Sequence, residues 1–300
     1  MPKALLLANG RSRRGRQLRS QATEQLHALG IDLIVESHLT VGHFSDCIRY
    51  YRDRLDFVVV GGGDGTINAT LSGLVETQLP FGVLPLGTAN DFARTLDLPL
   101  SLEAACGAIA AAWKQQRLQA IDLGWVNDRY FLNVASIGLS SRITQNLTGD
   151  IKRKWGVFAY AIAAAQAMGN ASPFRAEIDL GDRQIETKAL QIAIGNGRHY
   201  GGGLTVHREA ELDDGLLHLY ILEVESGWQI LPLLPALRQG HYLDLDRIRA
   251  FETRSATIRT DKPYKVNTDG ELMTHTPATF RVVPEILNIL IPPSSSPPNQ

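Results

Sequence analysis

Residues 58–71, VVVGGGDGTINATL, pass from three valines into three consecutive glycines and a single aspartate, Asp64. β-branched residues that run into glycine, with a helix-forming segment behind them, predict a buried strand, a tight turn and a helix. Because glycine has no Cβ atom, the backbone N–H groups of such a turn can approach a phosphate group closely. The N-terminus of the following helix adds a favourable partial positive charge. The stretch therefore predicts a phosphate-binding turn in an α/β domain.

Asp64 needs a separate explanation, because a carboxylate repels phosphate. In one interpretation it holds a metal ion, or a water molecule on that ion, between itself and the phosphate. In the other it only caps the next helix. The turn by itself leaves both interpretations open.

The segments around this turn alternate between short β-rich runs and helix-forming runs. Such alternation predicts a parallel sheet that helices cover on both faces. The expected strands are 3–9, 32–37, 56–63 and 81–87, and the expected helices are 15–30, 45–55, 65–76, 88–96 and 101–115.

A second turn of the same kind follows the next strand. Residues 84–95, LPLGTANDFART, end a strand in glycine and then place Thr88, Asn90 and Asp91 at the start of a helix. Because ligands of parallel sheets bind beyond the carboxyl ends of the strands, we expect both turns to face one crevice. Neither G-x-x-x-x-G-K-[ST] nor G-x-G-x-x-G follows the first strand, so a phosphate site must be built from these two turns.

The alternation stops near Arg117. Beyond it, β-rich runs separated by turn signals predict a largely antiparallel second domain, interrupted by helices at about 152–168 and 226–238. We therefore expect an α/β domain over 1–120 and a β-rich domain over 121–283. The composition of residues 293–300 predicts a disordered tail.

The composition excludes several classes of protein. The formal net charge of −1 over 300 residues argues against a nucleic-acid partner. Two cysteines exclude a disulfide framework and fit a reducing cytoplasm, and no Cys/His cluster has the spacing of a zinc motif. No segment approaches the roughly 20 apolar residues that span a bilayer, so any membrane association is expected to be peripheral.

Five blocks of the sequence resemble the diacylglycerol kinase catalytic family, and their order and spacing are most similar to the bacterial YegS-like lipid kinases. The blocks are GGGDGTINATL at 61–71, GVLPLGTANDFART at 82–95, AIDLG at 120–124, GNGRHYGGG at 195–203, and LDDGLLHL with NTDGE at 212–219 and 267–271. The similarity covers nearly the whole chain. GGDGT by itself is not specific, because NAD kinases and phosphofructokinases carry a similar turn.

This resemblance implies an α/β domain of the NAD-kinase and phosphofructokinase type with a parallel sheet, then a mostly antiparallel β-sandwich domain, with ATP in the cleft between them. The final strand, near 284–292, would return to the first domain. The implied activity is an Mg²⁺-dependent transfer of phosphate from ATP to a lipid of the phosphatidylglycerol or diacylglycerol class at the membrane surface. The alternatives are a kinase for a soluble substrate such as NAD, and a non-catalytic nucleotide-binding module. The sequence does not indicate the oligomeric state.

The resemblance also implies functional residues. The nucleotide contacts would be Asn9, Thr40, Gly62, Gly63, Asp64, Gly65, Thr66, Ile67, Asn68 and Thr88. Asp64 and Asp122 would hold the catalytic Mg²⁺, with Asp91 in support. The carbonyls of Glu211 and Leu216 and the side chain of Asp214 would bind a structural Mg²⁺ or Ca²⁺. At Asn9 the chain departs from the family pattern, because it has NGRSRRG where the family often has NP.SG.

The segment TDGE at 268–271 would supply the proton acceptor. Phosphoryl transfer needs alignment, charge neutralisation and deprotonation of the attacking hydroxyl group. By resemblance the acceptor is Glu271 or Asp269, with Glu271 favoured and Asp269 either as its partner or as a carboxylate on the side of the metal. Read by itself, the segment predicts a hairpin turn, because Asp-Gly is a strong hairpin signal.

Two apolar stretches could meet a lipid surface. Residues 157–169 follow the basic segment IKRKW, and residues 228–243 contain WQILPLLPAL. Basic residues beside an apolar stripe favour an anionic membrane surface. Burial in the core is the more common fate of such stretches, and the sequence favours it for both.

Overall fold

The computed structural model describes residues 1–8, 13–36, 40–146, 166–240, 242 and 246–292. The chain forms two compact units, Met1–Asp122 with Pro284–Gln300, and Leu123–Val283. Asn9, most of the helix expected over 152–168, and the tail expected over 293–300 lie outside the described residues.

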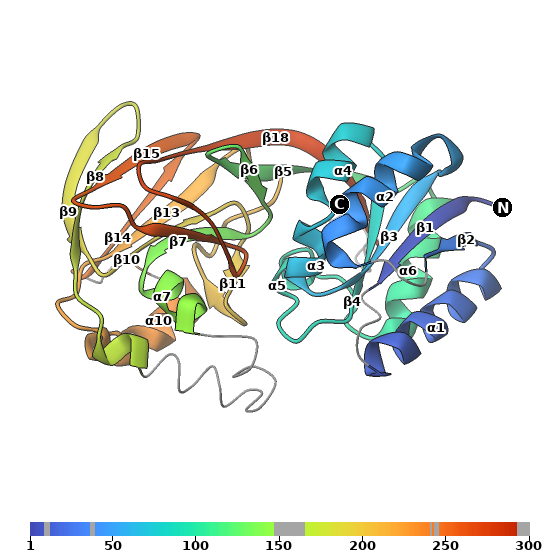
Figure 1. Cartoon of the computed structure of the whole chain (residues 1–300), viewed down its shortest axis with the longest axis horizontal. Coiled ribbons are helices and arrows are strands. Elements are labelled where there is room, and N and C mark those ends of the chain that lie inside the picture. The colour runs from blue at the N-terminus through green and yellow to red at the C-terminus, as the bar shows by residue number, and fades with distance from the viewer. Residues whose placement is uncertain (9–12, 37–39, 147–165, 241, 243–245, 293–300) are drawn as a thin grey trace, which may run out of the picture. The chain divides into compact units, whose positions relative to one another are not determined.

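A parallel sheet forms the centre of the first unit, with strand order β2-β1-β3-β4-β18 (Figure 1). The strands are β1 (Lys3–Ala8), β2 (Asp32–Val35), β3 (Phe57–Gly62), β4 (Phe81–Pro85) and the last part of β18 (Ala278–Leu290). The start of β5 (Leu118–Val126) pairs with β18. β1, β3 and β4 are almost wholly apolar because both faces of this sheet are covered.

Helices cover the two faces of this sheet (Figure 1). On one face α1 (Arg13–Ala28) and α6 (Leu102–Lys114) share a core with Leu6 and Val59. On the other face α2 (Phe44–Tyr51) and α4 (Leu71–Thr77) pack together, and α2 contacts β1. Short helices η1 (Val41–His43) and η2 (Arg52–Arg54) flank α2, while α3 (Asp64–Asn68) and α5 (Asp91–Thr95) follow β3 and β4.

The second unit is an antiparallel β-sandwich. One layer has the strand order β14-β13-β10-β7-β16-β17, and the other contains β9, β8, β15 and the first part of β18. The bounds are β7 (Val134–Gly138), β8 (Phe174–Asp179), β9 (Gln184–Ala189), β10 (Gln191–Gly195), β13 (Leu217–Leu222), β14 (Ile248–Thr253), β15 (Ser255–Thr260), β16 (Lys265–Thr268) and β17 (Glu271–His275). Apolar residues from both layers, such as Ile192 and Ile258, form the core between them.

The outer face of the β13-containing layer carries a second core. Tyr220 and Leu222 of β13 pack there with Ile230 and Leu237. The last two come from η3 (Gly227–Leu233) and α10 (Leu234–Gln239), and α7 (Leu139–Asn146) follows β7. Because this layer is covered on both faces, β10 and β13 are buried along their whole length. The smaller strands are β6 (Arg129–Phe131), β11 (His199–Tyr200) and β12 (Leu204–Thr205).

The expected fold class, a parallel α/β domain followed by an antiparallel β-sandwich, is confirmed. Some helix bounds differ from those expected from the sequence. The helix expected over 65–76 is divided into α3 and α4. The helix expected over 88–96 begins at Asp91, because Asn90 adopts a left-handed conformation with φ of 52°. None of the described helices is long and apolar enough to cross a membrane.

Candidate functional site

The glycine turn after β3 lies against the turn after β4. A Cβ atom on Gly87 would stand 2.4 Å from the Cα atom of Gly63, and one on Gly63 would stand 3.1 Å from the Cα atom of Gly87. Only glycine permits this approach. The two strand-end turns that the sequence singled out are therefore in direct backbone contact.

Asp64 fixes this contact. Its Oδ1 atom accepts a hydrogen bond from Phe92 N–H at 2.8 Å, and its Oδ2 atom accepts one from Asp91 N–H at 3.2 Å. The carboxylate thus caps a helix, but that helix is α5, 27 residues along the chain, rather than the helix of its own turn. Each carboxylate oxygen has a second lone pair, so capping leaves room for a further ligand.

Asn90 holds the second turn, a role that the sequence analysis did not assign. Its Oδ1 atom accepts from Gly87 N–H at 2.9 Å, and its Nδ2 group donates to the carbonyls of Gly87 at 3.1 Å and Pro85 at 3.3 Å. The signal for this role was present, because asparagine tolerates the left-handed backbone and bonds to neighbouring backbone groups. Its place between Gly87 and Asp91 could have identified it.

Asp91 and Asp122 are carboxylates inside the first unit. Their exposed fractions are 4% and 1%. The N–H group of Asp91 donates to the Asp64 carboxylate, so these two aspartates are neighbours. The Asp122 carboxylate accepts a hydrogen bond from Glu285 N–H at 2.7 Å and so joins β5 to β18. Buried carboxylates are costly unless they are paired or bind metal. Their carboxylate oxygens are the kind of donor that Mg²⁺ prefers. Among the described residues, however, the ligand atoms of Asp64, Asp91 and Asp122 do not all lie within 4.8 Å of one another.

The other expected nucleotide contacts of the first unit occupy varied positions. Thr40 precedes η1, and its Oγ1 atom lies 2.8 Å from His43 Nδ1. Thr66 and Asn68 are half-buried on α3, and Thr88 is exposed between β4 and α5. Ile67 is 2% exposed, so its side chain packs into the unit.

Asp269 and Glu271 have different surroundings. Asp269 and Gly270 both have positive φ, 50° and 90°, and form the two-residue turn between β16 and β17. The Asp269 carboxylate accepts from three backbone N–H groups, of Leu132 at 2.6 Å, Asn133 at 2.8 Å and Val134 at 3.1 Å. Glu271 is exposed at the start of β17, opposite Thr268. The hairpin is thus present, and only Glu271 directs its carboxylate to solvent.

The block GNGRHYGGG meets the segment that Asp269 holds. Asn196 Nδ2 donates to the carbonyl of Leu132 at 3.0 Å, and the N–H groups of Asn196 and Gly197 both bond to the carbonyl of Asn133. The hydrogen bonds therefore link this glycine-dense block, residues 132–134 and the Asp-Gly turn in one network within the second unit.

The loop 211–216 closes around Asp214. Its carboxylate accepts from Glu211 N–H at 3.1 Å, from Leu216 N–H at 2.8 Å, and lies 2.8 Å from His218 Nε2. Burial would raise the pKa of Asp214, but these hydrogen bonds outweigh burial and lower the pKa below its usual value. The structure thus brings together the three residues that the resemblance assigned to a structural metal.

Comparison with known proteins agrees with this two-unit architecture. The diacylglycerol kinase catalytic domain matches residues 3–126, and the YegS C-terminal NAD kinase beta sandwich-like domain matches residues 133–291. The chain is 33% identical to "Lipid kinase YegS" of Escherichia coli (strain K12) over 303 residues, 97% of each chain. It is 34% identical to "Probable lipid kinase YegS-like" of Klebsiella pneumoniae (strain 342), again over 97% of each chain.

Solved structures show the same fold. A crystal structure of a Bacillus anthracis str. Sterne protein, proposed to be a diacylglycerol kinase, superimposes with a TM-score of 0.81 at 24% identity, over 98% of this chain and 97% of that one. An α/β unit with paired glycine turns, followed by a β-sandwich, defines a two-domain kinase with a diacylglycerol kinase catalytic domain. The chain belongs to the YegS-like lipid kinase family.

Proposed function

We propose that the chain transfers the γ-phosphate of ATP to a hydroxyl group of a membrane lipid, with Mg²⁺ as cofactor. The observation that carries the proposal is the backbone contact between the glycine turns after β3 and β4, fixed by Asp64, in a chain of the lipid kinase family. Two glycine turns at one sheet edge allow a polyphosphate to approach the backbone N–H groups, because no side chains stand in the way.

The first unit would bind the nucleotide. Gly62–Asn68 would contact the phosphates, with Asn9, Thr40 and Thr88 as further contacts. The space beside Gly65 supports this assignment, because a Cβ atom there would meet nothing within 4 Å. The packing of the protein therefore does not require glycine at this position. A ligand that approaches the backbone closely would require it.

Asp64 and Asp122 would belong to the network that holds the Mg²⁺, with Asp91 in support. When bound, the ion neutralises charge on the transferred phosphate. The chain's own contribution is alignment. Asp64 keeps α5 against the glycine turn, and Asp122 keeps β5 against β18. Such fixed positioning is the main source of catalysis in phosphoryl transfer.

Glu271 would accept the proton of the attacking hydroxyl group. Asp269 is less suited to this role, because three backbone N–H groups already bond its carboxylate. Asp269 would instead position residues 132–134. A well-placed general base typically contributes about 10²–10⁴-fold to the rate.

A second cation would bind at loop 211–216. The carbonyls of Glu211 and Leu216 and the side chain of Asp214 offer oxygen ligands only, which suits Mg²⁺ or Ca²⁺. The N–H groups of both other residues bond to the Asp214 carboxylate, so the three residues lie close together in the loop.

The lipid would come from a bilayer that the second unit contacts. Trp228, Leu231 and Leu234 have exposed fractions of 54%, 48% and 37%, and they follow one another at intervals of three residues on η3 and α10. Exposed apolar side chains gathered on short helices favour an interfacial contact. The substrate would be phosphatidylglycerol or diacylglycerol, and the protein would associate with the membrane peripherally.

A lipid-panel assay tests this proposal. The full chain is incubated with γ-labelled ATP, Mg²⁺ and micelles that contain phosphatidylglycerol, diacylglycerol, a sphingoid base or an undecaprenol-type alcohol. We expect label in the organic extract, with a product mass increased by one phosphate. Glu271→Gln should lower the rate at least about 100-fold. Glu186→Gln, at another exposed glutamate of the second unit, should not change it.

Two results would contradict the proposal. Label that remains in the aqueous phase, on NAD or another soluble acceptor, would indicate a soluble-substrate kinase. ATP binding without turnover on any lipid would indicate a nucleotide-binding module.

A further inference from the structure

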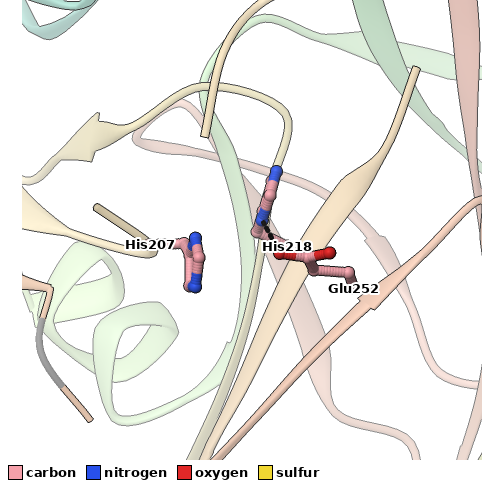
Figure 2. Close-up of side chains that lie close together, drawn as sticks. All are labelled: His207, His218 and Glu252. Atoms are coloured by element: carbon pink, nitrogen blue, oxygen red, sulfur yellow. Dashed lines mark ion pairs between the residues drawn. The ribbon is translucent and has the colours of Figure 1, made fainter. Parts of the chain in front are cut away.

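Three side chains with metal-binding atoms lie together on the second unit (Figure 2). His218 of β13 is the direct cross-strand partner of Glu252 of β14, and His207 comes from the segment that follows β12. One ligand atom from each residue lies within 4.8 Å of the others. The family blocks include His218 but neither His207 nor Glu252.

The buried His218 ring has one nitrogen atom without a hydrogen bond. The side chain is 3% exposed, and its Nδ1 atom has no hydrogen-bond partner. Glu252 Oε1 lies 3.8 Å from Nδ1, which is too long for a hydrogen bond (Figure 2). A buried polar atom without a partner requires an explanation, and an absent ligand is one of them.

Asp214 determines which His218 nitrogen carries the proton. Both carboxylate oxygens of Asp214 already accept hydrogen bonds from backbone N–H groups, those of Leu216 and Glu211, and an aspartate carboxylate acts only as an acceptor. Nε2 of His218, 2.8 Å away, must therefore be the donor. In the neutral ring, Nδ1 then presents a lone pair toward Glu252. A carboxylate that bonds one ring nitrogen while the other faces a metal is the usual arrangement around metal-binding histidines.

We propose that His207, His218 Nδ1 and Glu252 bind one divalent transition-metal ion of the Zn²⁺ type. Two imidazoles and one carboxylate match the donor sets of zinc sites with three protein ligands. Imidazole nitrogen favours Zn²⁺, Co²⁺ or Ni²⁺ over Mg²⁺ and Ca²⁺, which distinguishes this site from the oxygen-only loop at 211–216.

Binding requires a small, local rearrangement. Bonds of about 2.05 Å place the ligand atoms of a tetrahedral ion roughly 3.3 Å apart, so the three groups must approach one another. The rings of His207 and His218 are nearly parallel, 15° apart with centroids at 4.9 Å, and two parallel planes do not meet at one ion. His207 must therefore turn. Its ring torsion is soft, the residue is half-buried, and the only hydrogen bond described for its ring is a long one of 3.4 Å from Glu209 N–H.

The remaining coordination position faces a cavity. His207 and Glu252 line a pocket of about 510 Å³ together with Arg208, Glu209, Gly240 and Tyr242. Three protein ligands leave the fourth position open to water or to a small anion that enters this pocket.

Metal titration of the full chain tests the proposal. Chelator-treated protein is saturated with Mg²⁺, to fill oxygen-only sites, and then dialysed against Zn²⁺ or Co²⁺. We expect one ion per chain, and a Co²⁺ spectrum of a four-coordinate site with nitrogen and oxygen ligands and no thiolate band. His207→Ala and Glu252→Gln change partly exposed side chains, and each should weaken binding about tenfold or more. The matched controls His275→Ala and Glu186→Gln change exposed residues of the same unit and should bind as the wild type does.

Circular dichroism of each variant confirms that the fold is intact. The proposal is overturned if Mg²⁺-saturated protein binds no stoichiometric Zn²⁺ or Co²⁺. It is equally overturned if both ligand variants bind as tightly as the wild type, or if His275→Ala weakens binding as much as His207→Ala does.

Discussion

Gly62 and Gly65 stand three residues apart in one turn, yet the space around them differs. A Cβ atom on Gly62 would lie 2.4 Å from Thr66, whose Cβ atom cannot move without the backbone. A Cβ atom on Gly65 would meet no other atom within 4 Å. The fold itself therefore requires glycine at position 62, whereas at position 65 only a ligand would.

Gly62→Ala and Gly65→Ala should separate these two requirements. We expect Gly62→Ala to lower the free energy of unfolding by about 1–3 kcal/mol through overpacking. Gly65→Ala should leave stability unchanged or raise it by up to about 1 kcal/mol, because alanine favours the helix. Denaturant unfolding measures both. ATP binding by the Gly65→Ala protein, measured by calorimetry, should weaken, and tight binding there would contradict a phosphate contact at this position.

Asp269 and Glu271 should also differ in what they contribute, with Asp269 contributing to stability and Glu271 to activity. Asp269→Asn keeps the left-handed backbone but loses part of the bonding to three N–H groups, so unfolding free energy should fall by about 1–3 kcal/mol. Glu271→Gln should leave the unfolding midpoint unchanged and lower the rate at least about 100-fold. If Glu271→Gln destabilised the protein while Asp269→Asn left it intact, the roles would be reversed.

At the scale of elements, single side chains join segments that are distant in the sequence. Asp64 links the turn after β3 to α5, and Asp122 links β5 to β18. Arg49 does the same on the surface. Its guanidinium binds the Glu76 carboxylate at two points, both at 2.6 Å, and so joins α2 to α4. This fork geometry fixes the orientation of the two helices more firmly than a single contact would.

The α2–α4 pair should show a defined pH dependence. The hydrogen bond from Arg49 lowers the pKa of Glu76 below its ordinary value of 4.5. A lowered folded-state pKa means that the pair stabilises the protein above pH 4.5 and that this contribution is lost as the pH falls through the lowered pKa. The stability difference between wild type and Glu76→Gln should thus be constant from pH 7 to about 5.5 and shrink below 4.5. Denaturant unfolding across this range measures it.

Salt provides the control for this prediction. The pair is exposed, so high ionic strength should reduce the difference at neutral pH as well. A difference that stays the same from pH 6 to pH 3 would show that Glu76 acts through packing rather than through its charge.

At the scale of the whole molecule, the features that depend on local sequence patterns could be predicted from the sequence. Fully apolar runs such as 57–60 identified a sheet covered on both faces, and the two glycine turns were placed at one edge of it. Contacts that depend on the register in which two strands pair could not be predicted from local sequence patterns. The absence of zinc spacing said nothing about His218 and Glu252, which are 34 residues apart and become neighbours only because β13 and β14 pair in one register. A capping role was one of the two interpretations left open for Asp64, and the helix that it caps, α5, depends on how the two turns pack.

The exposed apolar side chains of η3 and α10 lead to a prediction about the whole protein at a bilayer. Trp228, Leu231 and Leu234 would each lose apolar surface on entering the interface, at about 25 cal/mol per Å². The triple change of these residues to serine should therefore weaken sedimentation with phosphatidylglycerol vesicles at least tenfold. The apparent KM for vesicle substrate should rise while kcat on a short-chain, monomeric lipid stays unchanged, because the reacting groups are not altered. Leu100→Ser, at an exposed leucine of the first unit, serves as the control. Equal losses on vesicle and monomeric substrate would show that these side chains serve folding or catalysis, and a triple variant that binds vesicles normally would place the membrane contact elsewhere.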